Sequence, residues 1–187
     1  VYGIKDSLNV HEDMILEPLT DYSKYKAECE KILSNYHSED FTTVTIRPAT
    51  VCGFSKRQRL DVIVNILTNL AYNKREVTVF GGNQLRPNIH IKDMINAYLK
   101  LIHSPKETIR KKAYNVGYEN HSVIKLANIV KNIIGNDVKL KITESNDSRS
   151  YHISSDKIKN EIGFSPEHTI SEAVKDLKEA FEKNIFV

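Results

Sequence analysis

Tyr22 and Lys26 are two residues whose types and spacing suit proton transfer. They stand four positions apart at the start of a predicted helix, so both side chains lie on one helical face. A lysine cation this close to a phenol favours the phenolate, and it lowers the tyrosine pKa from its reference value of about 10. The pair therefore predicts a general acid/base, Tyr22, that is tuned by Lys26.

Two alternatives to a catalytic pair stay open at the level of the residues. The chain has nine tyrosines and is rich in lysine, so one such spacing arises by chance. Tyr22 also belongs to an apolar stripe at helical spacing, which would make it a core aromatic. The stripe consists of Tyr22, Tyr25, Cys29, Ile32, Leu33 and Tyr36.

The elements that must position this pair follow from apolar periodicity and from capping residues. Short β-branched runs alternate with amphipathic segments, which is typical of an α/β protein with parallel strand pairs. In the helix expected over 92–103, we predict that Ile91, Ile95, Tyr98 and Ile102 form the buried side. The other expected helices are 22–36, 60–71, 122–135, 156–162 and one that begins after Thr169; the expected strands are 43–46, 77–80, 88–91, 113–116 and 138–142.

Composition excludes several classes of protein. Of the 187 residues 40% are hydrophobic and 27% charged, as in ordinary globular proteins, and no apolar run approaches the length of a membrane span. The net charge is +3, and a nucleic-acid-binding alternative would rest on residues 56–59 alone, so we expect no nucleic-acid partner. Cys29 and Cys52 fit neither a disulfide framework nor a zinc site, so we expect no metal and a reduced, cytoplasmic setting.

Arginines in the expected loops form a second group of candidates. Arg47, the 56–59 cluster with Arg59, Arg86 and Arg149 would bind a diphosphate if they converge, because guanidinium groups pair with phosphate oxygens in a bidentate manner. Solvated surface arginines are the alternative. We interpret His90, inside an apolar strand, as a structural histidine. No glycine-rich phosphate loop is present, so a nucleotide cofactor cannot be inferred from these residues directly.

Six motifs in a fixed order carry a family resemblance. The chain resembles the extended short-chain dehydrogenase/reductases, and more narrowly the C-terminal part of the NAD-dependent nucleotide-sugar epimerases and dehydratases. The motifs are Val1-Tyr2-Gly3, Tyr22-x-x-x-Lys26, Arg47-Pro48-x-x-x-x-Gly53, Arg86-Pro87-Asn88-Ile89-His90-Ile91-x-Asp93, Tyr114-Asn115-Val116-Gly117 and Gly163-Phe164-x-Pro166.

This resemblance implies a fold and a domain organisation. The expected fold is the C-terminal part of an NAD(P)-binding Rossmann fold joined to a small α/β substrate-binding domain. Residues 1–60 would supply the last elements of the Rossmann domain, and 61–187 mainly the substrate domain, with about 88–117 returning to the first. The family's glycine-rich cofactor motif and its catalytic serine or threonine are absent, so we expect a fragment that is inactive alone.

The resemblance also implies residue roles. Tyr22 matches the catalytic tyrosine, and Lys26 the lysine that holds the cofactor ribose. Pro48 and Ala49 match the segment against the nicotinamide, and Thr50, which replaces an asparagine common in the family, reaches the substrate. The other implied substrate contacts are Arg59, Val79, Phe80, Arg86 and Arg149.

The implied activity is oxidation or epimerisation at C4 of a nucleoside-diphosphate sugar, with NAD rather than NADP as cofactor and a homodimer as the assembly. A nucleotide-sugar 4,6-dehydratase or 4-dehydrogenase stays open. A non-catalytic module that binds a nucleotide sugar or a dinucleotide is the alternative of another class, although such a module has no need of a tuned phenol.

Overall fold

The computed structural model describes residues 1–5, 7, 9–145 and 150–186. Helices and short strands alternate along the chain, as the apolar pattern predicts. In chain order the elements are α1 (Asp21–Asn35), β1 (Val44–Pro48), β2 (Thr50–Cys52), α2 (Ile63–Lys74), β3 (Glu76–Phe80), β4 (Leu85–His90), α3 (Ile91–Ile102), α4 (Lys106–Ile109), β5 (Lys112–Val116), β6 (Glu119–Ser122), α5 (Val123–Ile134), β7 (Lys139–Thr143), α6 (Asp156–Ile162) and α7 (Ile170–Glu182).

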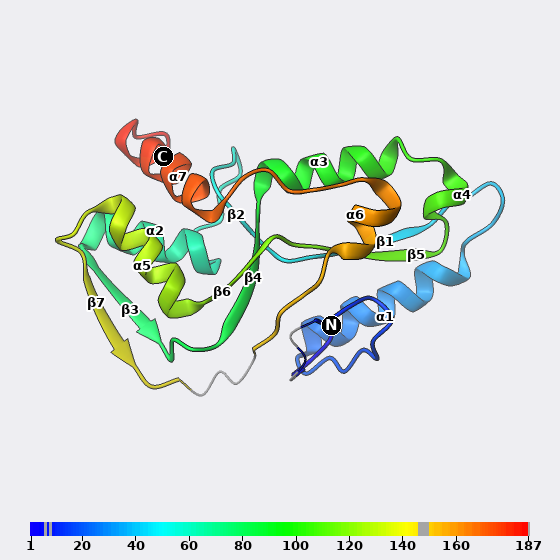
Figure 1. The fold of residues 1–187 in the computed structure, drawn as a ribbon, viewed down its shortest axis with the longest axis horizontal. Helices are drawn as coiled ribbons and strands as arrows, with labels where there is room; N and C mark the ends of the chain where they lie inside the picture. The colour runs from blue at the N-terminus through cyan, green and yellow to red at the C-terminus, as the bar shows by residue number, and fades with distance from the viewer. Residues whose placement is uncertain (6, 8, 146–149, 187) are drawn as a thin grey trace.

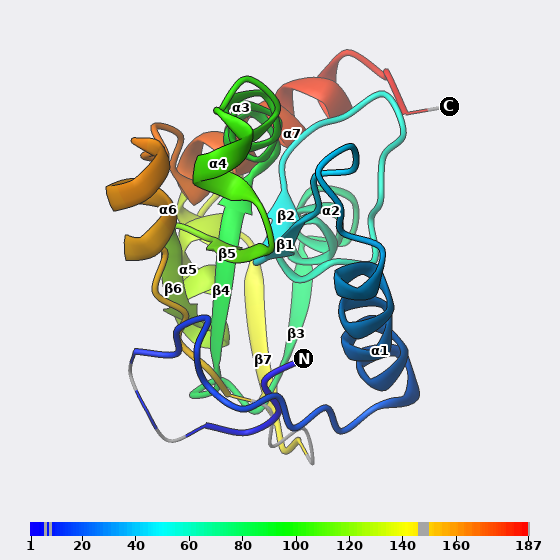
Figure 2. The ribbon, with the colours of Figure 1, turned by 90° about the vertical axis from the view of Figure 1, so that its right-hand side faces the viewer.

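Three small sheets organise the fold. Strand β1 runs parallel to β5, β3 runs parallel to β7, and β4 lies between parallel β2 and antiparallel β6. Helices α3 and α1 lie on opposite sides of the β1–β5 pair, as Figures 1 and 2 show. Parallel strands joined through helices confirm the predicted α/β class.

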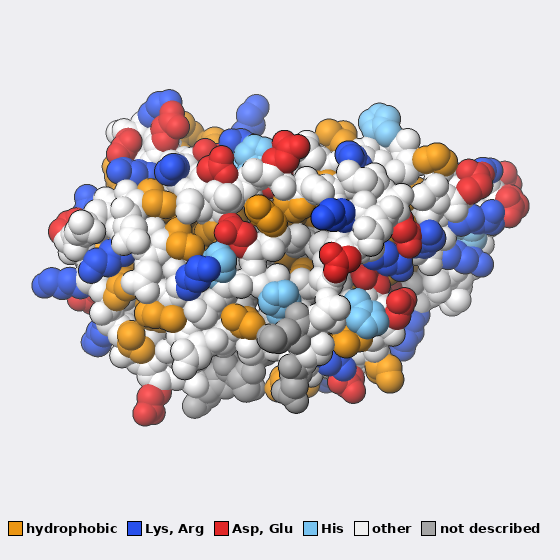
Figure 3. All heavy atoms as spheres, in the orientation of Figure 1, with side chains coloured by type: hydrophobic (Ala, Val, Ile, Leu, Met, Phe, Trp, Pro, Cys, Tyr) orange, Lys and Arg blue, Asp and Glu red, His pale blue; other side chains and the backbone are white. Residues whose placement is uncertain are grey.

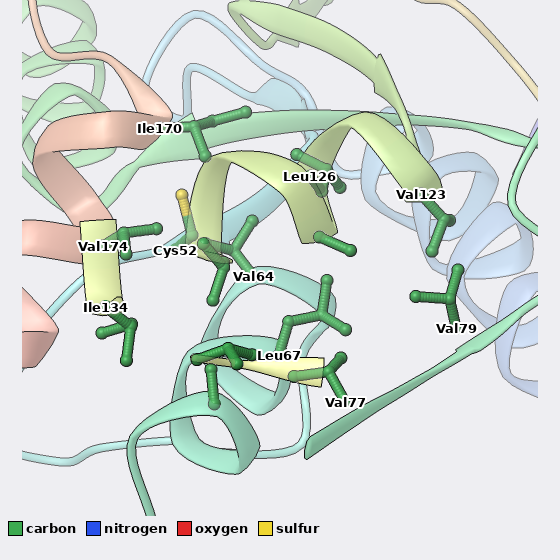
Figure 4. Close-up of a cluster of buried hydrophobic side chains, with 14 of the residues drawn as sticks. Cys52, Val64, Leu67, Val77, Val79, Val123, Leu126, Ile134, Ile170 and Val174 are labelled. Atoms are coloured by element: carbon green, nitrogen blue, oxygen red, sulfur yellow. The ribbon is translucent and has the colours of Figure 1, made fainter. Parts of the chain in front are cut away.

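Two hydrophobic cores hold these elements together. One lies among α2, α5, α7 and β3, and Figure 4 shows its branched side chains interlocking. The other joins the amino-terminal loop, α3, β5 and α6, with Tyr114 fully buried in it. The second core contains residues from Tyr2 to Phe164, so segments distant in sequence share it. The predicted boundary at residue 60 between the Rossmann domain and the substrate domain stays a prediction.

Helix ends follow the local chemistry of the sequence. Thr20 caps α1 and Thr169 caps α7, each in a reciprocal capping box with the residue three positions later. Gly163 ends α6 in the left-handed conformation that a side chain disfavours (φ 67°). These ends were predicted within a residue or two.

The buried face of α3 differs from the prediction. Ile95, Tyr98 and Ile102 are exposed, whereas Met94, Ala97 and Leu101 are buried. Both sets repeat at helical spacing, so periodicity alone does not choose between the two faces. The face that is buried is the one whose Met94, Ala97 and Leu101 pack in the second core with residues such as Tyr114 and Val116.

Other elements also differ from expectation. Strands β2 and β6 and the single-turn α4 were not predicted, because they are too short to show a period. Along α1, the expectation of Tyr22 as a core aromatic is wrong, because its side chain and that of Tyr25 are 74% and 72% exposed.

No described helix combines the length and the apolar character needed to cross a membrane. Within the same residues, no group of three or more His, Cys, Asp or Glu side chains is arranged to hold a metal ion. On the face drawn in Figure 3, lysine and arginine side chains are interspersed with aspartate and glutamate.

Candidate active site at the start of α1

The first turn of α1 presents Tyr22 to solvent. The Thr20 hydroxyl accepts a hydrogen bond from the Ser23 backbone N–H at 3.3 Å, and Ser23 Oγ accepts from the Thr20 N–H at 3.1 Å, which fixes this turn. Lys26 follows one turn later and is exposed. Neither the Tyr22 hydroxyl nor the Lys26 ammonium makes a hydrogen bond or an ion pair with another residue that the structure describes.

Tyr22 lies where two cavities adjoin. The first has a volume of about 250 Å³ and the second about 410 Å³. Both are lined by Tyr22, Pro48, Ala49 and Tyr151, which therefore form the wall that the cavities share. Lys26 lines neither of them. An exposed phenol at such a junction can exchange a proton with a ligand that extends from one cavity into the other.

The carboxyl end of β1 builds the apolar part of this wall. Pro48 ends the strand opposite Val116 of β5, and the Ala49 N–H then donates to the Val116 carbonyl at 2.8 Å. The neighbouring Gly117 makes this approach possible, because a Cβ there would lie 3.1 Å from the Ala49 Cβ. The segment after β1 is thus held against the segment after β5, at the edge where ligands bind in parallel sheets.

A hydrogen-bonded polar cluster forms another wall of the first cavity. The Tyr2 hydroxyl donates to Asn115 Oδ1 at 2.6 Å and accepts from Arg47 Nη1 at 2.8 Å. Burial raises the pKa of Tyr2, although the Arg47 hydrogen bond opposes this. Tyr2 is therefore a second phenol in the same cavity, but its hydroxyl already has two partners. The Tyr22 hydroxyl, in contrast, is open to a ligand.

The second cavity is lined by the loop between β2 and α2. Asn65 holds this loop, because its Oδ1 accepts from the Gly53 N–H at 3.1 Å and its Nδ2 donates to the Arg59 carbonyl at 2.8 Å. The Arg59 guanidinium pairs with Asp61 at 2.8 Å, which raises the pKa of Arg59 and lowers that of Asp61. The second cavity thus contains cationic, apolar and phenolic groups together.

A model of the NAD dependent epimerase/dehydratase family matches residues 1–117. The chain belongs to this family. The expected resemblance to the NAD-dependent epimerases and dehydratases is thereby confirmed.

Relatives of the family match most of this chain. It is 24% identical over 185 residues to a UDP-glucose 4-epimerase of Corynebacterium glutamicum, and the match covers 90% of this chain and 56% of the relative. It is similar in fold to the UDP-glucuronic acid 4-epimerase of Bacillus cereus in complex with UDP-glucuronic acid and NAD (TM-score 0.86, 24% identity, 98% of this chain and 59% of the other). It is also similar to the dTDP-glucose 4,6-dehydratase of Bacillus anthracis in complex with NAD (TM-score 0.85, 20% identity, 98% and 59%).

The chain spans a little over half the length of these relatives, 56% of the first. Its matches therefore extend over most of this chain and part of each relative.

The predicted site residues fall into two groups in space. Tyr22, Pro48, Ala49, Thr50 and Arg59 meet around the second cavity. Val79, Phe80 and Arg86 line neither cavity and lie on β3 and β4, although Pro87, the residue after Arg86, lines the first cavity. Arg149 lies outside the described residues.

Within the second group, Val79 and Phe80 face opposite ways. The Val79 side chain is fully buried in the core drawn in Figure 4, whereas the Phe80 side chain is exposed. Arg86 Nη1 donates to the Leu85 carbonyl at 3.0 Å. A ligand can therefore contact Phe80 through its ring, but Val79 only through its backbone.

The described candidate arginines contact different parts of the chain, and their shared role as diphosphate ligands stays a prediction. Arg47 pairs with Glu30 at 2.7 Å, Arg59 with Asp61, and Arg86 lies on β4. Our interpretation of His90 as structural is confirmed, because its Nδ1 accepts from the Lys92 N–H and caps α3.

Sequence reasoning missed Tyr151 and Asn65 as lining residues of this site. Tyr151 lines both cavities but stands in a polar segment without periodicity. Asn65 is a buried polar residue on the mostly apolar face of α2, and that contrast is the signal that could have identified it.

Proposed function

We propose that this chain supplies the acid-base group and the sugar-facing wall of an NAD-dependent enzyme that oxidises or epimerises C4 of a nucleoside-diphosphate sugar. The observation that carries the proposal is the open hydroxyl of Tyr22 at the junction of two cavities, beside the apolar Pro48–Ala49 wall. Family membership supports the same reaction class. NAD, rather than NADP, is the cofactor that we propose, as in the two Bacillus complexes.

The residues at the junction suit a nicotinamide cofactor. Pro48 and Ala49 offer an apolar surface of the kind that covers a flat aromatic ring, and Lys26 is a cation one turn from Tyr22 that can hydrogen-bond ribose hydroxyls. Tyr22, Lys26, Pro48 and Ala49 are thus the residues that would hold NAD. When bound, NAD supplies a hydride acceptor for a carbon–hydrogen bond.

The proton step belongs to Tyr22. Its phenolate would take the proton of the C4 hydroxyl, and the C4 hydride would pass to the NAD that Tyr22, Lys26, Pro48 and Ala49 would hold, which would leave a 4-keto sugar. Lys26 places a positive charge one helical turn from the Tyr22 phenol. If hydride returns to the opposite face of C4 and Tyr22 returns the proton, the product is the C4 epimer.

The remaining proposed roles concern substrate binding. Thr50 and Arg59, in the second cavity, would contact the sugar and its diphosphate. Phe80 and the backbone at Val79 would contact the base, and Arg86 and Arg149 the diphosphate. A 4,6-dehydratase or a 4-dehydrogenase would use the same first step, so the alternatives differ only in the fate of the 4-keto sugar.

A homodimer is the assembly that we propose. Besides Tyr22, α1 exposes Tyr25, Ile32 and Tyr36, and Ala27 is its buried residue. An exposed apolar stripe of this kind suits helix-to-helix packing between two copies. Sedimentation of the chain and of Ile32→Glu tests this: a dimer that the substitution dissociates is expected, and a monomer at all concentrations would contradict it.

Binding of UDP and of UDP-glucose to the tyrosine-labelled chain tests the function. We expect UDP-glucose to shift the ¹³C ring resonance of Tyr22 and UDP alone to leave it in place, because the sugar and not the diphosphate would reach the cavity junction. Tyr22→Phe identifies that resonance, and Tyr25→Phe is the control on the same helix.

Two results would contradict the proposal. If UDP-glucose binds without any change at Tyr22, the phenol does not face the sugar. If UDP and UDP-glucose, GDP, CDP and dTDP all fail to raise the melting temperature, this chain has no nucleotide-sugar site.

A further inference from the structure

Glu30 and Arg47 form a bidentate ion pair between α1 and β1. Arg47 Nη2 donates to Glu30 Oε2 at 2.7 Å, and Arg47 Nε donates to the two carboxylate oxygens at 3.1 and 3.2 Å. Both side chains are largely buried: 12% of the Arg47 side chain and 18% of the Glu30 side chain are exposed. This geometry fixes direction as well as distance, because a planar guanidinium matches a carboxylate in one orientation.

Glu30 lies on the same side of α1 as the proposed catalytic pair. Tyr22, Lys26 and Glu30 follow one another at intervals of four residues, which places them along one side of the helix. The helix has few other attachments, because Ala27 is its buried residue. The rotation of α1 about its axis therefore depends on Glu30 to an unusual extent.

Arg47 is itself held from two other directions. Its Nη1 donates to the Tyr2 hydroxyl at 2.8 Å and to the Glu12 carbonyl at 3.1 Å, and its guanidinium lies 5.1 Å from the centre of the Tyr2 ring. Tyr2 donates to Asn115, whose backbone N–H donates to Glu12 Oε1 at 2.7 Å. Hydrogen bonds thus fix the Arg47 side chain to the amino-terminal loop and, through Tyr2 and Glu12, to Asn115 of β5.

Arg47 also immediately precedes the wall that Tyr22 shares with Pro48 and Ala49. One residue therefore holds the helix through its side chain and the wall through its backbone. We propose that Glu30 is a positioning residue, which sets the rotation of α1 through Arg47 so that the Tyr22 hydroxyl faces the cavity junction. This inference rests on the proposed function, because only that function gives the Tyr22 hydroxyl a catalytic role. The effect of Glu30 on the position of α1 can be measured independently of that role.

The test compares Glu30→Gln with Glu28→Gln in the 187-residue chain. Gln keeps the shape of Glu30 but removes the charge that binds Arg47. Glu28 is a matched control, because it lies on the same helix in an exposed ion pair with Lys31. Hydrogen exchange of the α1 amides is read against that of α5, which belongs to the other core.

We expect Glu30→Gln to speed exchange of the α1 amides by about tenfold or more, since a hydrogen bond to a charged group is lost. The α5 amides stay at their original rates, and Glu28→Gln changes neither helix. A nitroxide attached to Cys29, the exposed cysteine, reports the distance between α1 and β1. The paramagnetic broadening of the β1 amide resonances by this label is expected to weaken in Glu30→Gln.

Two outcomes would overturn the inference. Unchanged α1 exchange and unchanged broadening of β1 would mean that Glu30 does not seat the helix. Equally faster amide exchange in α1 and α5 would mean that Glu30 stabilises the whole fold rather than positioning one helix.

A ligand arm of the experiment connects the inference to the proposed function. UDP-glucose is expected to shift the Tyr22 resonance in Glu28→Gln and to leave it in place in Glu30→Gln. If UDP-glucose does not bind the parent chain, the proposed function fails, while the exchange and broadening measurements still decide the role of Glu30.

Discussion

The fully buried imidazole of His90 faces the carboxylate of Asp176 across 3.4 Å, which brings the end of β4 against α7. Three other ionisable groups surround the pair. Lys92 also binds Asp176, at 2.8 Å, and the His168 ring lies 5.1 Å from His90 and binds Asp93. His90 Nδ1 accepts the Lys92 N–H, so its proton lies on Nε2, toward Asp176.

Acid is expected to destabilise the chain through His90. Burial lowers the pKa of this imidazole below its usual 6.5, even though Asp176 opposes the shift. The unfolded chain therefore binds more protons as the pH falls below about 6.5, so this contribution to stability is complete above that pH and is lost progressively below it. Protonation of Nδ1 would also remove the cap of α3.

Urea unfolding between pH 7.5 and 5 checks this. The fall in stability is expected to be smaller in His90→Asn, which does not titrate, and unchanged in His103→Asn, an exposed control. Equal pH dependence in His90→Asn and the parent chain would contradict the assignment.

Gly117→Ala is expected to destabilise the chain by about 1–3 kcal/mol, the usual effect of overpacking. The added Cβ would lie 2.7 Å from the Ile153 Cδ1 and 3.1 Å from the Ala49 Cβ. Ile153→Val removes the nearer atom, so the double variant should recover part of the loss. Thermal unfolding measures each step, and additive effects of the two substitutions would show that the clash does not occur.

Met94 and Ile95 test which face of α3 is buried. Met94 is 5% exposed and Ile95 is 52% exposed. Met94→Ala is expected to cost about 2–5 kcal/mol because it leaves a cavity, and Ile95→Ala about 0.5 kcal/mol or less. Urea unfolding of the two variants gives the comparison, and a larger loss at Ile95 would reverse the assignment of the face.

Arg59→Ala is expected to weaken UDP-glucose binding by about tenfold, because a charge-assisted hydrogen bond to the ligand would be lost. Arg75→Ala is the matched control, since Arg75 also forms a surface ion pair, with Asp137, but lines neither cavity. Calorimetric titration gives both affinities. Equal affinities in the two variants would remove Arg59 from the substrate site.

NAD is expected to bind this chain weakly by itself, in the millimolar range or above. The sequence has no glycine-rich loop to receive the pyrophosphate, which is where much of the binding energy of a dinucleotide arises. A thermal-shift titration with NAD checks this, with UDP as the comparison. A large NAD shift would mean that Tyr22, Lys26 and the Pro48–Ala49 wall are sufficient.

Local rules predicted the features that depend on neighbouring residues. The α1 helix, its Thr20 cap and the strands of the β1–β5 and β3–β7 pairs follow from periodicity and capping chemistry, which act over a few residues. The buried face of α3 did not follow, because two apolar stripes compete and the choice depends on what packs against the helix. Arg47 was one of several candidate phosphate ligands, with a solvated arginine as the alternative, and its partner Glu30, 17 residues away, was not foreseen.

The candidate site was predicted in part. Tyr22, Pro48, Ala49, Thr50 and Arg59 do meet at one cavity, and these came from family motifs rather than from periodicity. Tyr151 could not be found in this way, since it reaches the cavities from a segment more than a hundred residues further along the chain.

The hydrogen bond from Tyr2 to Asn115 joins residues 113 positions apart and has a consequence for synthesis. A ribosome adds residues at about 5–20 per second, so roughly 5–25 s separate the translation of these two positions. During that time α1 has already been made, but Arg47 lacks part of the support that orients the helix. The Tyr22 helix is therefore synthesised well before Asn115, which completes the hydrogen-bonded support of Arg47.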